Sequence, residues 1–137
     1  MSISLTEIDH IGIAVDNLEE AVATYRTLLG IDPTHRERVE DQGVEEVLFR
    51  VGAGYIQLLG ALSPDTPVGR SLVSRGPGLH HVAYRVSDIQ TALEHFRAEG
   101  AQLIDHAPRP GSRNTTIAFI HPRSMNGVLV ELVQEGN

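Results

Sequence analysis

Residues 8–26, IDHIGIAVDNLEEAVATYR, and residues 79–97, LHHVAYRVSDIQTALEHFR, are two versions of one pattern. Aligned without a gap, they place His10 opposite His81, an offset of 81 − 10 = 71 residues. Identical or similarly apolar residues recur along the rest of the alignment. An internal repeat of this kind indicates a duplicated structural unit. We therefore expect two similar modules.

Each copy begins with alternating apolar residues, which is typical of a strand with one face in the core. A helical pattern follows and ends at Gly30 in the first copy and at Gly100 in the second, since glycine commonly follows the last turn of a helix. Three further strands are predicted in each copy: near 33–39, 44–51 and 55–61, and near 101–105, 115–120 and 128–134. Each copy thus predicts the order β-α-β-β-β, and the fold class is α+β.

The length of 137 residues suits one compact domain, 1–137, built from both modules. Module one covers about 5–62 and module two about 78–135. The connector, 63–77, is rich in proline and glycine, and 68–75 within it has room for one short helix.

Composition and charge exclude several functions. The net charge of −7 disfavours nucleic acids and anionic membranes as partners, because both attract basic surfaces. No apolar run approaches the roughly 20 residues that span a bilayer, and the N-terminus lacks the features of a signal peptide, so we expect a cytoplasmic protein. The chain has no cysteine and all 11 basic residues are arginine, which excludes thiolate and lysine Schiff-base chemistry.

Four polar residues occupy related positions in the two modules. Strand alternation places His10 and His81 on the face turned away from each module's helix. The last strands carry Gln57 and Glu131 among apolar neighbours, at an offset of 131 − 57 = 74 residues. Two imidazoles, a carboxylate and an amide oxygen suit a divalent first-row metal with open positions. The competing interpretation is that each is a hydrogen-bonded structural residue.

Glu46 is a further candidate. In the stretch GVEEVLFRV, 43–51, alternation places Glu46 on the same face as Leu48, so that it could point into a cleft. A solvated glutamate on an edge strand is the alternative.

At these residues the sequence resembles the vicinal oxygen chelate superfamily and, within it, the methylmalonyl-CoA epimerases. The matching stretches cover most of the chain: IDHIGIAV, EDQGVEEVLFRVG, YIQLLGAL, GPGLHHVAYRVSDI and IAFIHPRSMNGVLVELV. The first of these stretches is common to the whole superfamily, whereas their combination is specific to the epimerases.

The resemblance implies paired β-α-β-β-β modules around a divalent metal, usually cobalt or manganese. It implies the metal ligands His10, Gln57, His81 and Glu131, and Glu46 as a catalytic acid/base opposite Glu131. It also implies an acyl-CoA substrate, methylmalonyl-CoA, and a homodimer. The stretch PRPGSRNTTIAFIHP departs from the pattern at a place where relatives vary, which puts the contacts to CoA in doubt.

The expected reaction is epimerisation of (2R)- and (2S)-methylmalonyl-CoA through a metal-stabilised enolate. Two carboxylates flanking the carbon alpha to the thioester would remove and return the proton, and these are Glu46 and Glu131. The anionic CoA needs local positive charge, for which Arg113 and Arg123 are candidates, with Arg109 as a third choice.

Three alternatives remain. A glyoxalase-type lyase acting on a glutathione hemithioacetal would share the fold and the metal site. A non-catalytic metabolite-binding protein of the same fold would not need four metal ligands. A ring-cleaving dioxygenase prefers two histidines and one carboxylate, so that Gln57 would be superfluous.

Overall fold

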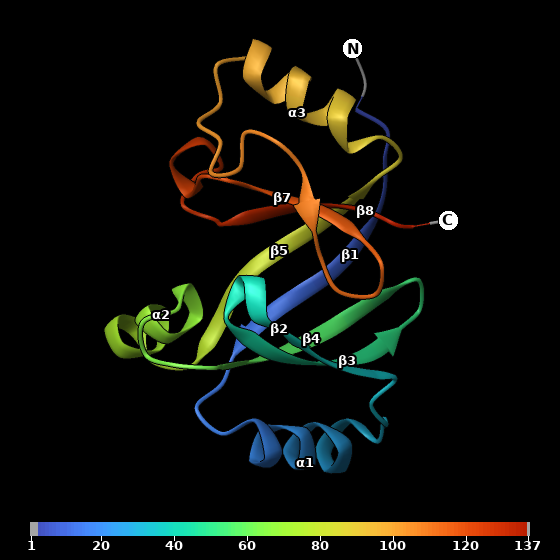
Figure 1. Ribbon diagram of the computed structural model, residues 1–137. Coiled ribbons are helices and arrows are strands. Elements are labelled where there is room, and N and C mark those ends of the chain that lie inside the picture. Colours follow the sequence, from blue (N-terminus) through green and yellow to red (C-terminus); the bar gives the residue numbers. More distant parts are fainter. Residues whose placement is uncertain (1–2, 137) are drawn as a thin grey trace. The chain divides into compact units, whose positions relative to one another are not determined.

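The computed structural model describes residues 3–136 and has the predicted order of elements twice (Figure 1). The first repeat contains β1 (Leu5–Ala14), α1 (Leu18–Leu29), β2 (His35–Val39), β3 (Val44–Val51) and β4 (Gly54–Ala61). The connector contains α2 (Pro67–Arg75). The second repeat contains β5 (Gly78–Val86), α3 (Ile89–Ala98), β6 (Arg109–Pro110), β7 (Thr116–Ile120) and β8 (Val130–Gln134). Two short 3-10 turns, η1 (Glu40–Gln42) and η2 (Pro122–Ser124), complete the described chain. The α+β class and the tandem β-α-β-β-β modules are confirmed.

The helices begin and end where their sequences favour it. The Asn17 side chain accepts a hydrogen bond from the Glu20 backbone N–H at the start of α1, and Asp88 does the same for Thr91 in α3. Gly30 closes α1 in a left-handed conformation that glycine adopts without strain. None of the helices between residues 3 and 136 combines the length and apolar character needed to cross a bilayer.

Contacts divide the chain into two compact units whose boundaries differ from those of the sequence repeat. The central unit comprises residues 11–80, and the terminal unit combines the chain up to His10 with the chain from His81 onward. Strand β1 contributes its first half to the terminal unit and its second half to the central unit. The single domain 1–137 stays a prediction.

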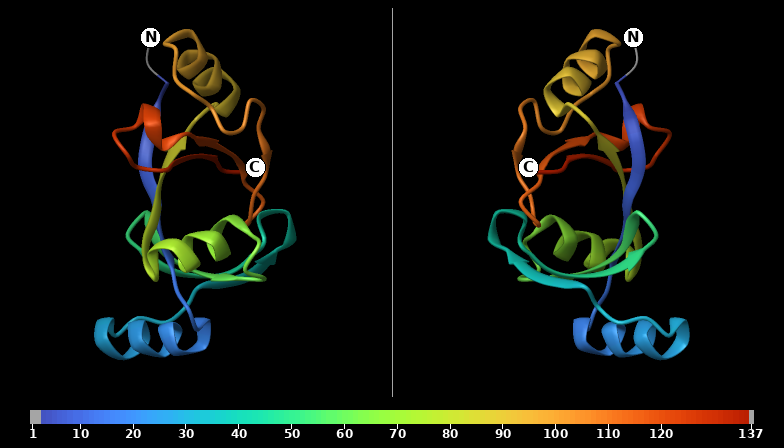
Figure 2. Two further views of the ribbon diagram at one scale, coloured as in Figure 1. Left: turned by 90° about the vertical axis from the view of Figure 1, so that its left-hand side faces the viewer. Right: turned by 90° about the vertical axis from the view of Figure 1, so that its right-hand side faces the viewer.

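In the central unit the strands follow the order β2-β3-β4-β1. Helix α1 covers one face, where its apolar residues pack against Val15, Val47, Phe49 and Leu58. Helix α2 covers the other face, where Val68 packs against Ala14 and Leu59 (Figures 1 and 2). Burial of this apolar surface on both sides of the strands is what stabilises the unit.

In the terminal unit the order is β1-β5-β8-β7-β6. Helix α3 packs on one face, through Ala92 and Leu93, against apolar residues that include Val86, Ile120 and Leu132. The opposite face carries a small apolar cluster and the polar residues described below. Alternation along β5 and β8 therefore separates an apolar face, which packs under α3, from an opposite face that carries polar side chains.

The strand predicted near 101–105 is wrong. Within that stretch only Leu103 forms an isolated bridge, to Ile120, and the strand beside β7 at the edge of the sheet is the two-residue β6. The backbone N–H groups of Ile104 and Asp105 both donate to the Phe119 carbonyl, at 3.0 and 3.2 Å, so the chain bends there instead of continuing along β7. Prolines in the following stretch remove donors that a longer strand would need.

Candidate metal centre

Three strands of the terminal unit bring two histidines and one glutamate together. Strand β1 carries His10, β5 carries His81 and β8 carries Glu131. Strands β5 and β8 run parallel, and Glu131 pairs with Ala83, which shares a strand face with His81. All three polar side chains are buried. The structure thus brings together three of the four residues that the repeat relates.

The three side chains meet through one atom each. The Nε2 atoms of His10 and His81 lie 3.0 Å apart, and Glu131 Oε1 lies 2.9 Å from the first and 3.1 Å from the second. Neighbouring ligands of a six-coordinate ion with bonds of roughly 2.1 Å are about 3.0 Å apart, whereas tetrahedral ligands are about 3.4 Å apart. The donor set and its spacing therefore fit a divalent metal that keeps further positions open.

The charges of the triad compensate for its burial. Burial lowers the pKa of His10, but the charge of Glu131 and the hydrogen bond to Asp9 outweigh it and raise the pKa to about 9. Burial holds the pKa of His81 below its usual value despite its contact with Glu131. Burial also raises the pKa of Glu131, but the two histidines overcome this and lower it. A cation that binds here must therefore displace a proton from His10.

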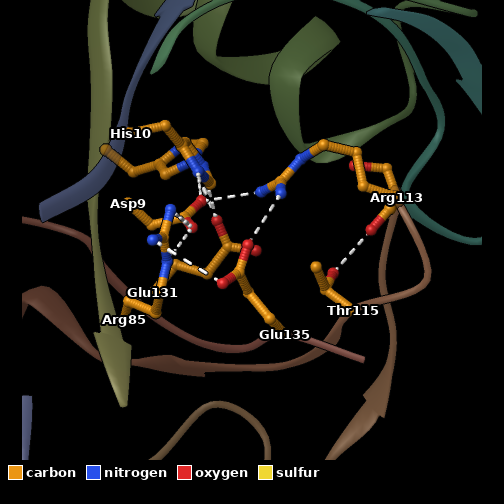
Figure 3. A network of polar contacts seen from close by, with 9 residues as sticks. Asp9, His10, Arg85, Arg113, Thr115, Glu131 and Glu135 are labelled. Carbon is orange, nitrogen blue, oxygen red and sulfur yellow. Dashed lines mark hydrogen bonds and ion pairs between the residues drawn. The ribbon is translucent and has the colours of Figure 1, made fainter. Parts of the chain in front are cut away.

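A ring of four charges lies beside His10 (Figure 3). His10 Nδ1 donates to Asp9 Oδ2 at 2.6 Å. Asp9 Oδ1 accepts from Arg85 Nε at 2.9 Å, and Asp9 Oδ2 accepts from Arg113 Nη2 at 2.8 Å. Glu135 closes the ring, 3.6 Å from Arg85 Nη1 and 3.8 Å from Arg113 Nη1. Burial raises the pKa of Asp9, but His10 and the two arginines outweigh it and lower the pKa.

Sequence reasoning missed Asp9, Arg85 and Glu135. Strict alternation turns Asp9 away from His10, whereas the structure buries its carboxylate completely and directs it to the imidazole. One signal was available: aspartate is depleted in strands, yet here it stands inside an apolar strand beside a predicted ligand.

Glu46 and Gln57 lie in the central unit. In the antiparallel pairing of β3 with β4, Glu46 lies opposite Leu59 and Gln57 opposite Leu48, so the two polar residues are diagonal neighbours on one face. Both are buried. Gln57 Oε1 has no hydrogen-bond partner within residues 3–136, as expected of an amide oxygen suited to an external ligand. Their roles as catalytic residue and metal ligand stay predictions.

The predicted CoA-binding arginines differ in their surroundings. The Arg113 side chain is only 13% exposed and pairs with two carboxylates. Arg123 is exposed, and its Nη1 donates to Gln102 Oε1 at 3.3 Å. Arg109 pairs with Asp105 at 3.2 Å and stacks over Phe119. The contact of any of them with CoA remains a prediction.

The sequence pattern of one known superfamily extends over most of this chain. The profile of the Glyoxalase/Bleomycin resistance protein/Dioxygenase superfamily matches residues 9–119, which include His10, His81, Glu46 and Gln57. The chain belongs to this superfamily. Its membership confirms the resemblance to the vicinal oxygen chelate proteins, and the triad is a group of residues that could hold a metal ion of the expected kind.

Individual members of the superfamily are similar over nearly the whole chain. The structure of a Streptomyces coelicolor methylmalonyl-CoA epimerase variant in complex with 2-nitronate-propionyl-CoA has a TM-score of 0.95 and 38% sequence identity, covering 97% of this chain and 96% of that one. The mitochondrial methylmalonyl-CoA epimerase of Dictyostelium discoideum is 32% identical, over 97% of this chain and 81% of its own length. The uncharacterised protein YqjC of Bacillus subtilis is 40% identical, over 95% and 93%.

Proposed function

We propose that this protein is an isomerase that interconverts (2R)- and (2S)-methylmalonyl-CoA in a metal-dependent reaction. The observation that carries the proposal is the buried triad of His10, His81 and Glu131 in a chain that matches methylmalonyl-CoA epimerases over nearly its full length. A non-catalytic binding protein of the same fold would not need such a set of metal ligands.

The triad would hold a divalent ion, with cobalt as the first choice and manganese as the second. When bound, the ion acts as a Lewis acid that stabilises negative charge on the oxygen of the thioester-derived enolate. The ionisation of Glu131 and the orientation of the two imidazoles suit metal binding. Glu131 is held ionised by the two histidines, and both imidazoles present Nε2 toward the same point.

Epimerisation requires a proton to leave one face of the carbon alpha to the thioester and to return on the other. We assign the two proton transfers to Glu46 and Glu131. In this assignment Glu131, which the two histidines hold ionised, is the base for one stereoisomer. Glu46 is buried on β3, on the face that it shares with Leu48 and Gln57, a setting in which water would not compete for a reactive carbanion.

The phosphates of the CoA substrate would bring negative charge, which arginine side chains could bind. Arg123 is the better placed of the two predicted arginines, because it is exposed and its side chain donates to the neutral amide of Gln102. Arg113 already neutralises Asp9. A homodimer remains part of the proposal, and sedimentation analysis would test it.

The experiment is exchange of the α-hydrogen of methylmalonyl-CoA in deuterated water, followed by NMR. Chelator-treated protein is compared with the same protein refilled with Co²⁺ or Mn²⁺. Fast exchange that depends on the metal supports the proposal. Absence of exchange with folded, metal-loaded protein contradicts it, and the same protein would then be assayed with glutathione hemithioacetals.

A two-histidine, one-carboxylate set is also typical of non-haem iron oxygenases. The amide of Gln57 favours the epimerase, because a fourth protein ligand leaves fewer positions for oxygen and substrate. Its buried and unsatisfied Oε1 is the feature of this chain that supports such a ligand.

A further inference from the structure

We propose that Arg113 and Asp9 are positioning residues that prepare His10 for metal binding and thereby couple the turn at residues 112–115 to the metal centre. The proposal rests on the metal site described above. It concerns the residues that contact His10 at Nδ1, the ring nitrogen that does not face the triad. It is independent of the reaction that the metal supports.

The turn at residues 112–115 has an unusual residue, Arg113, at its first central position. The Thr115 N–H donates to the Ser112 carbonyl at 2.9 Å, and both central residues have positive φ, 53° for Arg113 and 57° for Asn114. Positive φ at both positions is the signature of the tight hairpin turn that favours asparagine and glycine. Arginine has no intrinsic preference for this conformation. We infer that its side-chain contacts are the reason for its presence.

The closest of those contacts is with a buried charge. Asp9 is fully buried, which is costly for a carboxylate unless it is paired. Arg113 Nη2 reaches it across 104 residues of sequence, and Arg85 approaches its other oxygen. Glu135 balances the second positive charge. The ring is neutral as a whole, so the Asp9 carboxylate can stay ionised without solvent.

An ionised Asp9 determines how the imidazole of His10 is used. A carboxylate is a strong acceptor for the Nδ1 proton, and an imidazole protonated at Nδ1 keeps its lone pair at Nε2. Nε2 is the atom that meets His81 and Glu131. Carboxylate partners of this kind orient metal-binding histidines and strengthen them as ligands, typically by 10- to 100-fold in affinity.

The test is titration of the metal-free protein with Co²⁺, with visible absorption reporting on the coordination of the ion. Two variants remove the coupling: Asp9→Asn, and Arg113→Asn, which places a residue that favours the turn at its first central position. We expect the Co²⁺ affinity to fall roughly 10- to 100-fold in both, with a changed absorption spectrum. Arg113→Lys keeps the charge and should stay within about threefold of the wild type, since charge neutralisation is what Asp9 requires.

Arg26→Asn is the matched control, since it removes the same charge from a residue that pairs with Asp32 on the surface. Its affinity and spectrum should equal those of the wild type. Unchanged affinity and spectrum in folded Asp9→Asn and Arg113→Asn would overturn the proposal, even if both variants melt at lower temperature. A wild-type protein that binds no Co²⁺ would overturn both the metal centre and the coupling. If Co²⁺ binding is weakened in the two variants but the metal-loaded wild type shows no α-hydrogen exchange, the coupling is supported and the epimerase function is contradicted.

Discussion

At the scale of single residues, His10 is held at both nitrogens of its ring. Nδ1 donates to Asp9, and Nε2 faces Glu131 at 2.9 Å. Two carboxylates on one imidazole favour its positive form, which explains why the pKa rises to about 9 although burial acts in the other direction. The same proton is then linked to folding and to metal binding.

This linkage predicts how the stability of the metal-free protein depends on pH. A raised pKa means that the folded state holds the proton more tightly, so the stabilisation is complete below the unfolded value near 6.5 and is lost between pH 6.5 and 9. The loss is at most about 3 kcal/mol. Urea unfolding across pH 6 to 10 measures it, and His10→Gln should flatten the profile. The lowered pKa values of His81 and Glu131 act at more acidic pH and leave this window to His10.

Glu46→Gln tests the proposed acid/base residue without changing its shape. Loss of the ionisable group should reduce α-hydrogen exchange by about 10²- to 10⁴-fold, the usual contribution of a general base. The Co²⁺ affinity should stay within about twofold, because Glu46 is not among the proposed ligands. Loss of metal together with activity would make Glu46 a structural residue. Glu45→Gln, the neighbour that pairs with Arg36 on the surface, is the control.

At the scale of elements, the strands β3 and β4 act as a two-sided platform. One side is apolar and packs on α1, and the other presents Glu46 and Gln57. Helix α2 covers part of this second side through Val68. The start of α2 lies close to the backbone of Ser63 and Pro64, just before the helix, and this close contact leaves no room for a side chain at one position of α2.

Gly69 is that residue. A Cβ at this position would lie 2.2 Å from the Ser63 carbonyl oxygen and 2.9 Å from Pro64 Cα, both of which belong to the backbone. Alanine normally favours a helix over glycine by about 1 kcal/mol. We nevertheless expect Gly69→Ala to destabilise the protein by about 2 kcal/mol or more, because the connector must move.

Chemical denaturation measures this effect. Ser74→Ala, at an exposed position of the same helix, should change the stability by less than about 0.5 kcal/mol. A stabilising Gly69→Ala would show that the connector yields easily.

At the scale of the whole molecule, metal binding should stabilise the fold by mass action. Co²⁺ at 100 times its dissociation constant adds about 2.7 kcal/mol, which corresponds to roughly 10 °C in melting temperature for a chain of this size. His81→Ala should abolish the shift, since it removes one atom of the triad that we propose as metal ligands. A shift of the same size in His81→Ala would place the metal elsewhere.

A variant of Gln57 tests the proposed fourth metal ligand. We expect Gln57→Ala to weaken Co²⁺ binding about tenfold and to change its absorption spectrum, because an oxygen ligand is exchanged for water. Gln90→Ala, an exposed glutamine of α3, is the control. Unchanged binding in Gln57→Ala would leave a three-ligand centre and strengthen the case for oxygenase-like chemistry.

The sequence by itself determined the two β-α-β-β-β modules and the meeting of His10, His81 and Glu131. Strand alternation and helical spacing are local patterns, so the face on which a residue lies follows from its sequence neighbours. The repeat then shows which positions of the two modules are equivalent. Composition also excluded whole classes of chemistry without reference to any fold.

Only the tertiary structure decided the environment of the site. The ring of Asp9, Arg85, Arg113 and Glu135 joins segments that are far apart in the chain, and no local pattern encodes which charged residue meets which. It likewise decided the unit boundary within β1 and replaced the strand at 101–105 by a bend. Ion pairs and sheet edges depend on what lies across space, and that is settled when the strands pack.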